Sequence, residues 1–265
     1  MQLSFDHLVH FSPNPEEAKS ELLEQGVHVI KGGHHESWGT FNTLSYFGLS
    51  YIEWLGFHDR LLAEGVTDND LIRQFVKEGT AIGHFGRFAL RTERIEDVSE
   101  TLKEKGYDVE GPVAGSRRRE DGSMLEWKML FVRSDEHELP LPFFIEWGED
   151  DLTREKALEP FFHHPQGTLK IENIYCAVHQ VFETSEKWAA LLELHLGEVY
   201  RDPVLDATCR KLYLHGGNLI LCESESGLVN ETLQTVGERP FLVEMYNAKE
   251  KAAFTVQNGR FRLKR

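Results

Sequence analysis

Three residues with metal-binding or acid–base chemistry stand inside apolar, strand-like segments of this chain. His7 lies in FDHLVHF, Glu53 in SYIEWLG and Glu146 in PFFIEWGE. A carboxylate in the middle of an apolar strand needs a partner, because burying an unpaired charge is costly. One imidazole and two carboxylates suit a divalent ion such as Mn²⁺, Fe²⁺, Ni²⁺ or Zn²⁺. We therefore expect His7, Glu53 and Glu146 to be metal ligands, with positions left for water and substrate oxygens.

Arg87 offers these two acids a different partner. A guanidinium cannot be a metal ligand, but Arg87 alone could neutralise both glutamates without any ion. In that case Arg87 would belong to the substrate-binding residues. The residue types leave both possibilities open.

A repeated order of elements places these residues. The alternating run Phe5–Phe11 predicts a strand, and Asn14 and Pro15 predict the start of a helix that stops at Gly26. Three further strand-like runs follow, VHVIKGG, NTLSYFG and SYIEWLG. The predicted order is therefore β-α-β-β-β.

The same order returns in the next part of the chain. The sequence distance from His7 to Gly26 equals that from Arg87 to Gly106, and the tripeptide Ile-Glu-Trp occurs at both 52–54 and 145–147. Matched spacing and an identical tripeptide indicate an internal duplication. Because side chains alternate along strands, we expect the two tripeptide tryptophans on the face opposite the glutamates. The duplication predicts one pseudo-symmetric cleft on which four side chains converge: His7, Glu53, Arg87 and Glu146.

We expect an α+β fold of repeated βαβββ modules, with the first pair intact and the second pair degenerate. Residues 1–150 form the first pair (1–57 and 82–150), 151–167 a linker, and 168–265 a second pair whose last module is truncated. Asn173 stands near the His7 position of this second pair. The segment GLVNETLQTVGE also resembles DNDLIRQFVKEG, and each precedes the strand that opens a module.

Longer segments resemble a known family. GGHHESWGTFNTLSYFGLSYIEWLG, SRRREDGSMLEWKM and LPFFIEWG are similar to the glyoxalase-like domain of the vicinal oxygen chelate superfamily. Metal-dependent members place one ligand on the first and one on the last strand of each module, and His7, Glu53 and Glu146 match three of those places. At the fourth of those places this sequence has Arg87 and not a metal-binding residue. The resemblance implies a cleft and either a metal-dependent isomerase, lyase or dioxygenase or a metal-free, drug-sequestering protein.

Further candidates surround the expected cleft. The family pattern places a histidine just before a Gly-Thr pair, which makes His35 a candidate acid or base beside Glu146. Thr40 and Asn42 can orient a substrate oxygen, although ordinary turn chemistry would also explain them. Arg117, in a charged hairpin, is our candidate for receiving a carboxylate. Trp127 is a candidate pocket wall, with a core position as the alternative.

The amino-acid composition indicates which kinds of partner this protein is expected to bind. The net charge of −15 argues against nucleic acid and against anionic membranes, so we expect a small-molecule ligand. Three cysteines without CxxC spacing, and no apparent signal peptide, favour a cytoplasmic protein. No phosphate-loop or dinucleotide motif is present, so no nucleotide cofactor is expected. A homodimer would suit such modules.

Two main hypotheses follow. In the first, an ion at His7, Glu53 and Glu146 holds neighbouring substrate oxygens and stabilises an enolate-like charge, while His35 or a glutamate moves the proton. In the second, the cleft binds or sequesters a small molecule without metal. An interaction scaffold is a third possibility, and it would predict no defined pocket in the first module pair.

Overall fold

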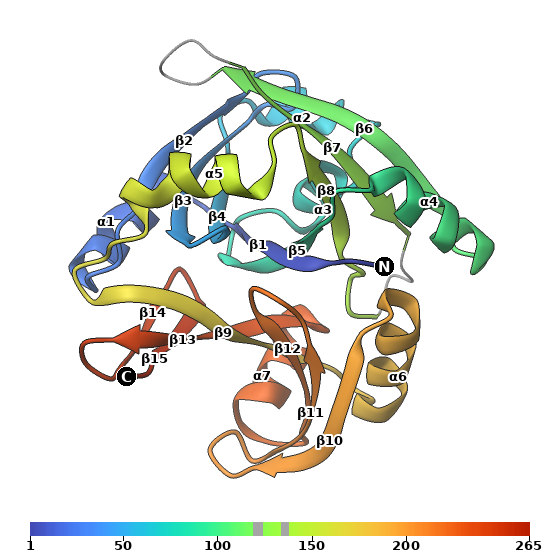
Figure 1. Ribbon diagram of the computed structural model, residues 1–265. Helices are drawn as coiled ribbons and strands as arrows, with labels where there is room; N and C mark the ends of the chain where they lie inside the picture. The colour runs from blue at the N-terminus through green and yellow to red at the C-terminus, as the bar shows by residue number, and fades with distance from the viewer. Residues whose placement is uncertain (119–123, 134–137) are drawn as a thin grey trace.

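A computed structural model shows an α+β protein whose strands form two curved sheets that lie against each other (Figure 1). It describes residues 1–118, 124–133 and 138–265, except for the side chains of 117 and 118. Each sheet is built from modules that begin at its centre, which confirms the predicted fold class of repeated βαβββ modules. None of the described helices is long and apolar enough to cross a membrane.

The first sheet has the strand order β2-β3-β4-β1-β5-β8-β7-β6. The opening strands of its two modules, β1 and β5, pair antiparallel at the centre, so a pseudo-twofold axis passes between them. The elements of these modules are β1 (Ser4–Phe11), α1 (Pro15–Glu24), β2 (Ile30–His35), β3 (Thr40–Phe47), β4 (Ser50–Phe57), β5 (His84–Arg91), α4 (Ile95–Glu104), β6 (Val109–Arg118), β7 (Met124–Val132) and β8 (Phe143–Trp147).

Two short helices between the modules, α2 (Arg60–Glu64) and α3 (Asp70–Glu78), lie on the concave side of this sheet. The Asn69 side chain caps α3 by accepting a hydrogen bond from the Ile72 amide at 3.2 Å. Leu71, Ile72 and Phe75 then pack against apolar residues of β1 and β4. Gly79 ends the helix at φ 71°, where a side chain would be strained. Helix α3 thus covers part of the sheet's concave face.

The second sheet repeats this arrangement with the order β10-β11-β12-β9-β13-β15-β14. Its last module has no helix between its strands. Helix α7 (Gly227–Val236) ends at Gly237, φ 79°, and packs on the concave face as α3 does in the first sheet. The other elements are α5 (Asp151–Leu158) and the 3₁₀ turn η1 (Glu159–Phe161) between the sheets, and β9 (Gly167–Ala177), α6 (Val181–Leu192), β10 (His195–Asp202), β11 (Ala207–Tyr213), β12 (Asn218–Glu223), β13 (Arg239–Ala248), β14 (Ala252–Val256) and β15 (Gly259–Leu263).

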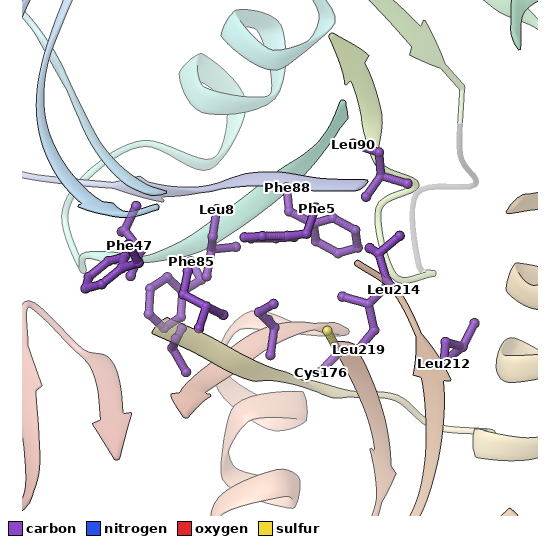
Figure 2. Close-up of a cluster of buried hydrophobic side chains, with 14 of the residues drawn as sticks. Phe5, Leu8, Phe47, Phe85, Phe88, Leu90, Cys176, Leu212, Leu214 and Leu219 are labelled. Carbon is purple, nitrogen blue, oxygen red and sulfur yellow. The ribbon is translucent and has the colours of Figure 1, made fainter. Parts of the chain in front are cut away.

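The main core lies between the two sheets. Figure 2 shows Phe5, Phe85 and Phe88 of the first sheet facing Cys176 and Leu219 of the second. Each large apolar side chain that is fully buried here contributes about 1.5–3 kcal/mol to folding. The opposite, concave face of the first sheet is therefore the face that remains available for a site.

Candidate functional site

A cavity of about 60 Å³ lies between the concave face of the first sheet and α3. Five of its lining residues (His35, Trp38, Asn42, Tyr46 and Trp147) also line a wider groove that leads to the surface. The cavity is thus the inner end of a larger depression. Its lining is mainly aromatic and aliphatic, with two histidines (His7 and His35), Glu53 and two asparagines as polar members.

A β-bulge in β1 brings the side chains of Asp6 and His7 together. Phe5 pairs with Leu90 and His7 with Ala89, so Asp6 is an extra residue on this strand. Neighbouring side chains of a regular strand point to opposite faces, but a bulge relaxes that alternation. The Asp6 carboxylate consequently lies 2.7 Å from Nδ1 of His7. Phe5 goes to the core between the sheets, whereas His7 lines the cavity.

Glu53 lies on β4 beside His7. Its Oε2 is 3.5 Å from His7 Nε2, and its Oε1 accepts a 2.6 Å hydrogen bond from the Asn42 amide nitrogen. The Asn42 oxygen is fixed by the Gly33 amide at 3.0 Å. A Cβ at Gly32 would lie 1.8 Å from that oxygen, so the glycine is needed for this close approach. His7 and Glu53 are 3% and 7% exposed, and together they form a buried polar pair.

Charged residues surround Asp6 behind His7. Arg91 donates to the Asp6 carboxylate at 3.1 Å, as does the indole N–H of Trp147. Burial opposes ionisation, but the neighbouring Arg154, His7 and Arg91 outweigh it and hold the pKa of this carboxyl well below its usual range. Asp6 is therefore an anion, and a hydrogen bond to it requires the proton to sit on Nδ1 of His7. Nε2 of His7 is then the nitrogen that faces Glu53.

Aromatic rings form the walls. Tyr51 stacks on His7 with ring centres 4.4 Å apart, and Phe143 meets it edge-on at 5.3 Å. Burial, with the charges of Asp6 and Glu53, raises the pKa of Tyr51 well above its usual value, so the phenol remains protonated. At the opening, the Trp127 ring lies 6.4 Å from that of Trp38 and 5.8 Å from that of Trp147.

The other sequence candidates occupy different positions around this opening. His35 lines the cavity, and its Nδ1 lies 2.9 Å from the hydroxyl of Thr40, which is buried behind it. Asn42 and Trp127 also line the cavity. Arg117 belongs to β6, opposite Leu125, but its side chain lies outside the described residues.

Glu146 does not converge on His7 and Glu53, so this expectation was wrong. Its carboxylate accepts a 2.8 Å hydrogen bond from the Ile95 amide at the start of α4, and Lys128 lies 3.6 Å away. The reason is strand register: Glu53 lies opposite Val9, and the equivalent pairing in the second module is Phe143 with Ala89. Relative to the strand pairing, the second Ile-Glu-Trp tripeptide is thus shifted by an odd number of residues. The Glu146 side chain therefore points to the face of the sheet opposite the one on which Glu53 lies.

The same offset changes the roles of the tryptophans. Trp54 is fully buried in the core between the sheets, as expected from its position beside Glu53. Trp147, expected on the face away from the cleft, lines the cavity instead.

Arg87 does not neutralise the two glutamates. Its guanidinium donates to the Asp70 carboxylate at 2.6 Å and to the backbone oxygens of Leu141 at 2.5 Å and Val132 at 3.1 Å. Asp70 is the first residue of α3, so this 3%-exposed arginine anchors the helix that covers the cavity. The cavity lining formed by the described residues does not include Arg87.

These positions do not fit the expected metal site. Phe143, which cannot ligate an ion, stands where the second module would supply a carboxylate. Among the described residues no group of three or more histidine, cysteine, aspartate or glutamate side chains is arranged to hold a metal ion. His7 and Glu53 alone would leave most of the coordination shell to other ligands.

The family model for the glyoxalase-like domain matches residues 5–192. The chain belongs to this family. The match covers both modules of the first sheet, with the cavity, and confirms the resemblance drawn from the sequence. The search of curated proteins gives no match to this glyoxalase-like chain.

Solved structures share the fold. A hypothetical protein from Staphylococcus aureus is 22% identical, covers 98% of each chain and superposes with a TM-score of 0.83. A mutant of 4-hydroxymandelate synthase from Streptomyces coelicolor is 11% identical, with a TM-score of 0.55 over 93% of this chain and 71% of its own. A xylose isomerase-like TIM barrel/4-hydroxyphenylpyruvate dioxygenase fusion protein is 14% identical, with a TM-score of 0.53 over 92% of this glyoxalase-like chain and 36% of its own.

Sequence reasoning missed several residues of the site. The role of Asp6 depends on a β-bulge, and the role of Trp147 depends on a register offset. Neither feature can be recognised in a single sequence. Arg154 was overlooked because it lies in a segment interpreted as a linker. Tyr51 carried a usable signal, since it stands two residues before Glu53 on the same strand face.

Proposed function

We propose that this glyoxalase-like chain is an enzyme that moves a proton on a small carbonyl-containing molecule, as an isomerase or lyase does. The supporting observation is the buried pair of His7 Nε2 and Glu53 Oε2, 3.5 Å apart, at the inner end of an aromatic cavity. A carboxylate and an imidazole side by side can act as base and acid on adjacent atoms of one substrate.

The geometry suggests different roles for Glu53 and His7, one as base and the other as hydrogen-bond donor. Glu53 would take a proton from the carbon next to the carbonyl group, and the electron pair of the broken C–H bond would form the C=C bond of an enolate. The imidazolium form of His7, with a proton on Nε2 in addition to the one on Nδ1 that faces Asp6, would donate a hydrogen bond to the enolate oxygen as negative charge develops there. For an α-hydroxy carbonyl substrate this intermediate is an enediolate: the former carbonyl carbon takes the proton back from Glu53, and the proton of the neighbouring hydroxyl passes to the former carbonyl oxygen, which completes an isomerisation. Asn42 holds the Glu53 carboxylate in place through the 2.6 Å hydrogen bond.

The two ring nitrogens of His7 lie between two carboxylates. Nδ1 is 2.7 Å from Asp6 and Nε2 is 3.5 Å from Glu53, so a proton on either nitrogen has a carboxylate partner. No step of this proposal uses a metal ion, because the position of Phe143 does not fit the three-ligand site.

A second candidate is a protein that binds its ligand without transforming it. The aromatic lining favours this role, since rings provide large contact surfaces for an apolar ligand body. In that case Glu53 would be a hydrogen-bond acceptor for the ligand and not a base.

Hydrogen exchange distinguishes the two candidates. The protein is incubated in D₂O with a panel of small α-hydroxy and α-keto carbonyl compounds, and loss of the C–H signal is followed by ¹H NMR. We expect exchange of at least one compound, slowed about 10²–10⁴-fold by Glu53→Gln, which is the usual contribution of a general base. Glu146→Gln is the matched control and should exchange at the wild-type rate. Equal rates for Glu53→Gln and wild type would refute the assignment.

A further inference from the structure

Arg154 reaches the groove from α5, outside the repeated modules. Its guanidinium lies over the Trp147 ring, 4.3 Å from the ring centre, and the residue is 4% exposed. Arg154 and Trp147 both line the groove, and Trp147 also lines the inner cavity. A buried cation therefore stands beside the passage that leads to His7 and Glu53.

The carboxylates that form ion pairs with this cation lie beyond hydrogen-bond distance of its Nη1 atom. Asp6 lies 3.6 Å and Asp151 3.7 Å from the Arg154 Nη1 atom. Arg91 takes the same two carboxylates at shorter distances, 3.1 Å to Asp6 and 2.8 Å to Asp151. Among the described residues, Arg154 Nη1 has no hydrogen-bond partner. A buried guanidinium nitrogen without an acceptor is costly and calls for an explanation, which a bound ligand would provide.

The geometry points to a carboxylate-binding subsite at Arg154. The ligand class is a small organic acid with a flat aromatic or conjugated body. Its carboxylate would meet Arg154 in the groove, while its body passes between Trp38, Trp127 and Trp147 toward the inner cavity. Charge-assisted hydrogen bonds from a guanidinium are strong and suit the planar carboxylate. The inference names the substrate class of the proposed site and rests on that proposal.

Because the molecule carries a large negative net charge, binding of an anion in the groove would depend on a local cation such as Arg154. At a net charge of −15, the protein as a whole repels anions. Lys31, another cation of the groove, is exposed and lies 3.6 Å from the Glu16 carboxylate. Arg154, in contrast, is shielded from water, which strengthens its attraction for an anion.

Calorimetry with matched probes tests the subsite. Phenylacetate, 3-phenylpropionate and 2-naphthylacetate are each compared with their primary amide, which has nearly the same shape but no charge. We expect wild type to bind at least one acid tenfold or more tightly than its amide. Arg154→Met should remove that preference while amide binding persists, and Arg154→Lys, which keeps the charge, should retain part of it. Arg94→Met changes an exposed arginine of similar length and should leave the preference intact.

The possible outcomes separate this inference from the proposed function. Equal binding of acid and amide by wild type, or an unchanged preference in Arg154→Met, overturns the subsite and leaves the His7–Glu53 proposal standing. Deuterium exchange that depends on Glu53 but is no faster for acids than for uncharged compounds likewise overturns the subsite and leaves the His7–Glu53 proposal standing. Wild type that binds none of the acids or amides contradicts the subsite, while the exchange experiment independently decides on His7 and Glu53. Thermal unfolding of each variant verifies that it is folded.

Discussion

Asp6 and His7 are neighbours in the chain, and their side chains nevertheless act on each other. The bulge in β1 turns the Asp6 carboxylate toward the imidazole, and two arginines and an indole N–H hold that carboxylate in place. This arrangement fixes the ring orientation of His7 and keeps a proton on its Nδ1 nitrogen. A buried acid outside the cavity lining thus defines the chemistry of a residue inside it.

Replacing Asp6 by Asn should be strongly destabilising. The Asp6 carboxylate is fully buried and compensates Arg91 and Arg154, so its loss leaves two buried guanidiniums with only the Asp151 carboxylate between them. We expect the free energy of unfolding to fall by about 3–5 kcal/mol, measured by urea denaturation. Asp108→Asn removes an exposed carboxylate that pairs with Arg133, and should change stability by less than about 1 kcal/mol. Similar effects of the two substitutions would contradict this account of the network.

At the scale of elements, strand register decides which residues form the site. The sequence repeat aligned Glu146 with Glu53, but hydrogen-bonded pairing aligns Phe143 with Glu53. The strand face, and with it the local chemistry, follows the pairing and not the tripeptide.

This register makes a prediction about metal binding. Phe143→His places an imidazole at the position that faces His7, and completes a set of two histidines and one carboxylate. We expect Ni²⁺ or Zn²⁺ to raise the unfolding temperature of this variant, and wild type to show a much smaller rise. Glu146→His is the matched control, because that side chain points toward α4, and it should show no gain over wild type. A larger metal-dependent rise in wild type than in Phe143→His would contradict the assigned register.

The elements themselves were predictable where local signals are strong. Asn14 and Pro15 start α1 as expected, with the Asn14 side chain accepting from the Glu17 amide. The order β-α-β-β-β was visible from alternation and turn residues. Asp6 and Arg154 could not be assigned, because their roles depend on a bulge and on the docking of α5, which are properties of tertiary structure. His7, Glu53 and Asn42 were found because each is polar within an apolar strand.

At the scale of the whole molecule, two buried histidines connect distant parts of the chain. His10 of β1 donates to the Gln257 backbone oxygen at 3.0 Å, and His164 bonds to the Tyr46 oxygen and the His28 amide, both at 2.9 Å. Burial, with nearby His84, lowers the pKa of His10 to about 3. Burial likewise lowers the pKa of His164 to about 4.

These histidines predict loss of stability in mild acid. Below a pH of about 6.5 the unfolded chain binds protons that the folded protein does not, so stability is full above that pH and falls as the pH decreases toward about 4. Each histidine contributes about 1.4 kcal/mol per pH unit in this range. The free energy of unfolding at pH 5 should therefore be about 4 kcal/mol lower than at pH 7.

Substitution identifies the source of this pH dependence. His10→Gln keeps a donor for Gln257 but cannot gain a proton, so it should lose only about half as much stability as wild type between pH 7 and pH 5. His179→Gln, at an exposed position, should behave as wild type. Urea denaturation at both pH values measures the difference, and an unchanged pH dependence in His10→Gln would rule out this origin.

Three of the five tryptophans of the chain, Trp38, Trp127 and Trp147, surround the cavity, whereas Trp54 and Trp188 are fully buried in the core between the sheets. Indole emission responds to the polarity and the quenchers around the ring. A molecule that enters the cavity would alter the surroundings of the first three rings and leave the other two unchanged. The protein thus has a built-in fluorescent reporter, with its own internal reference, for the arrival of a ligand.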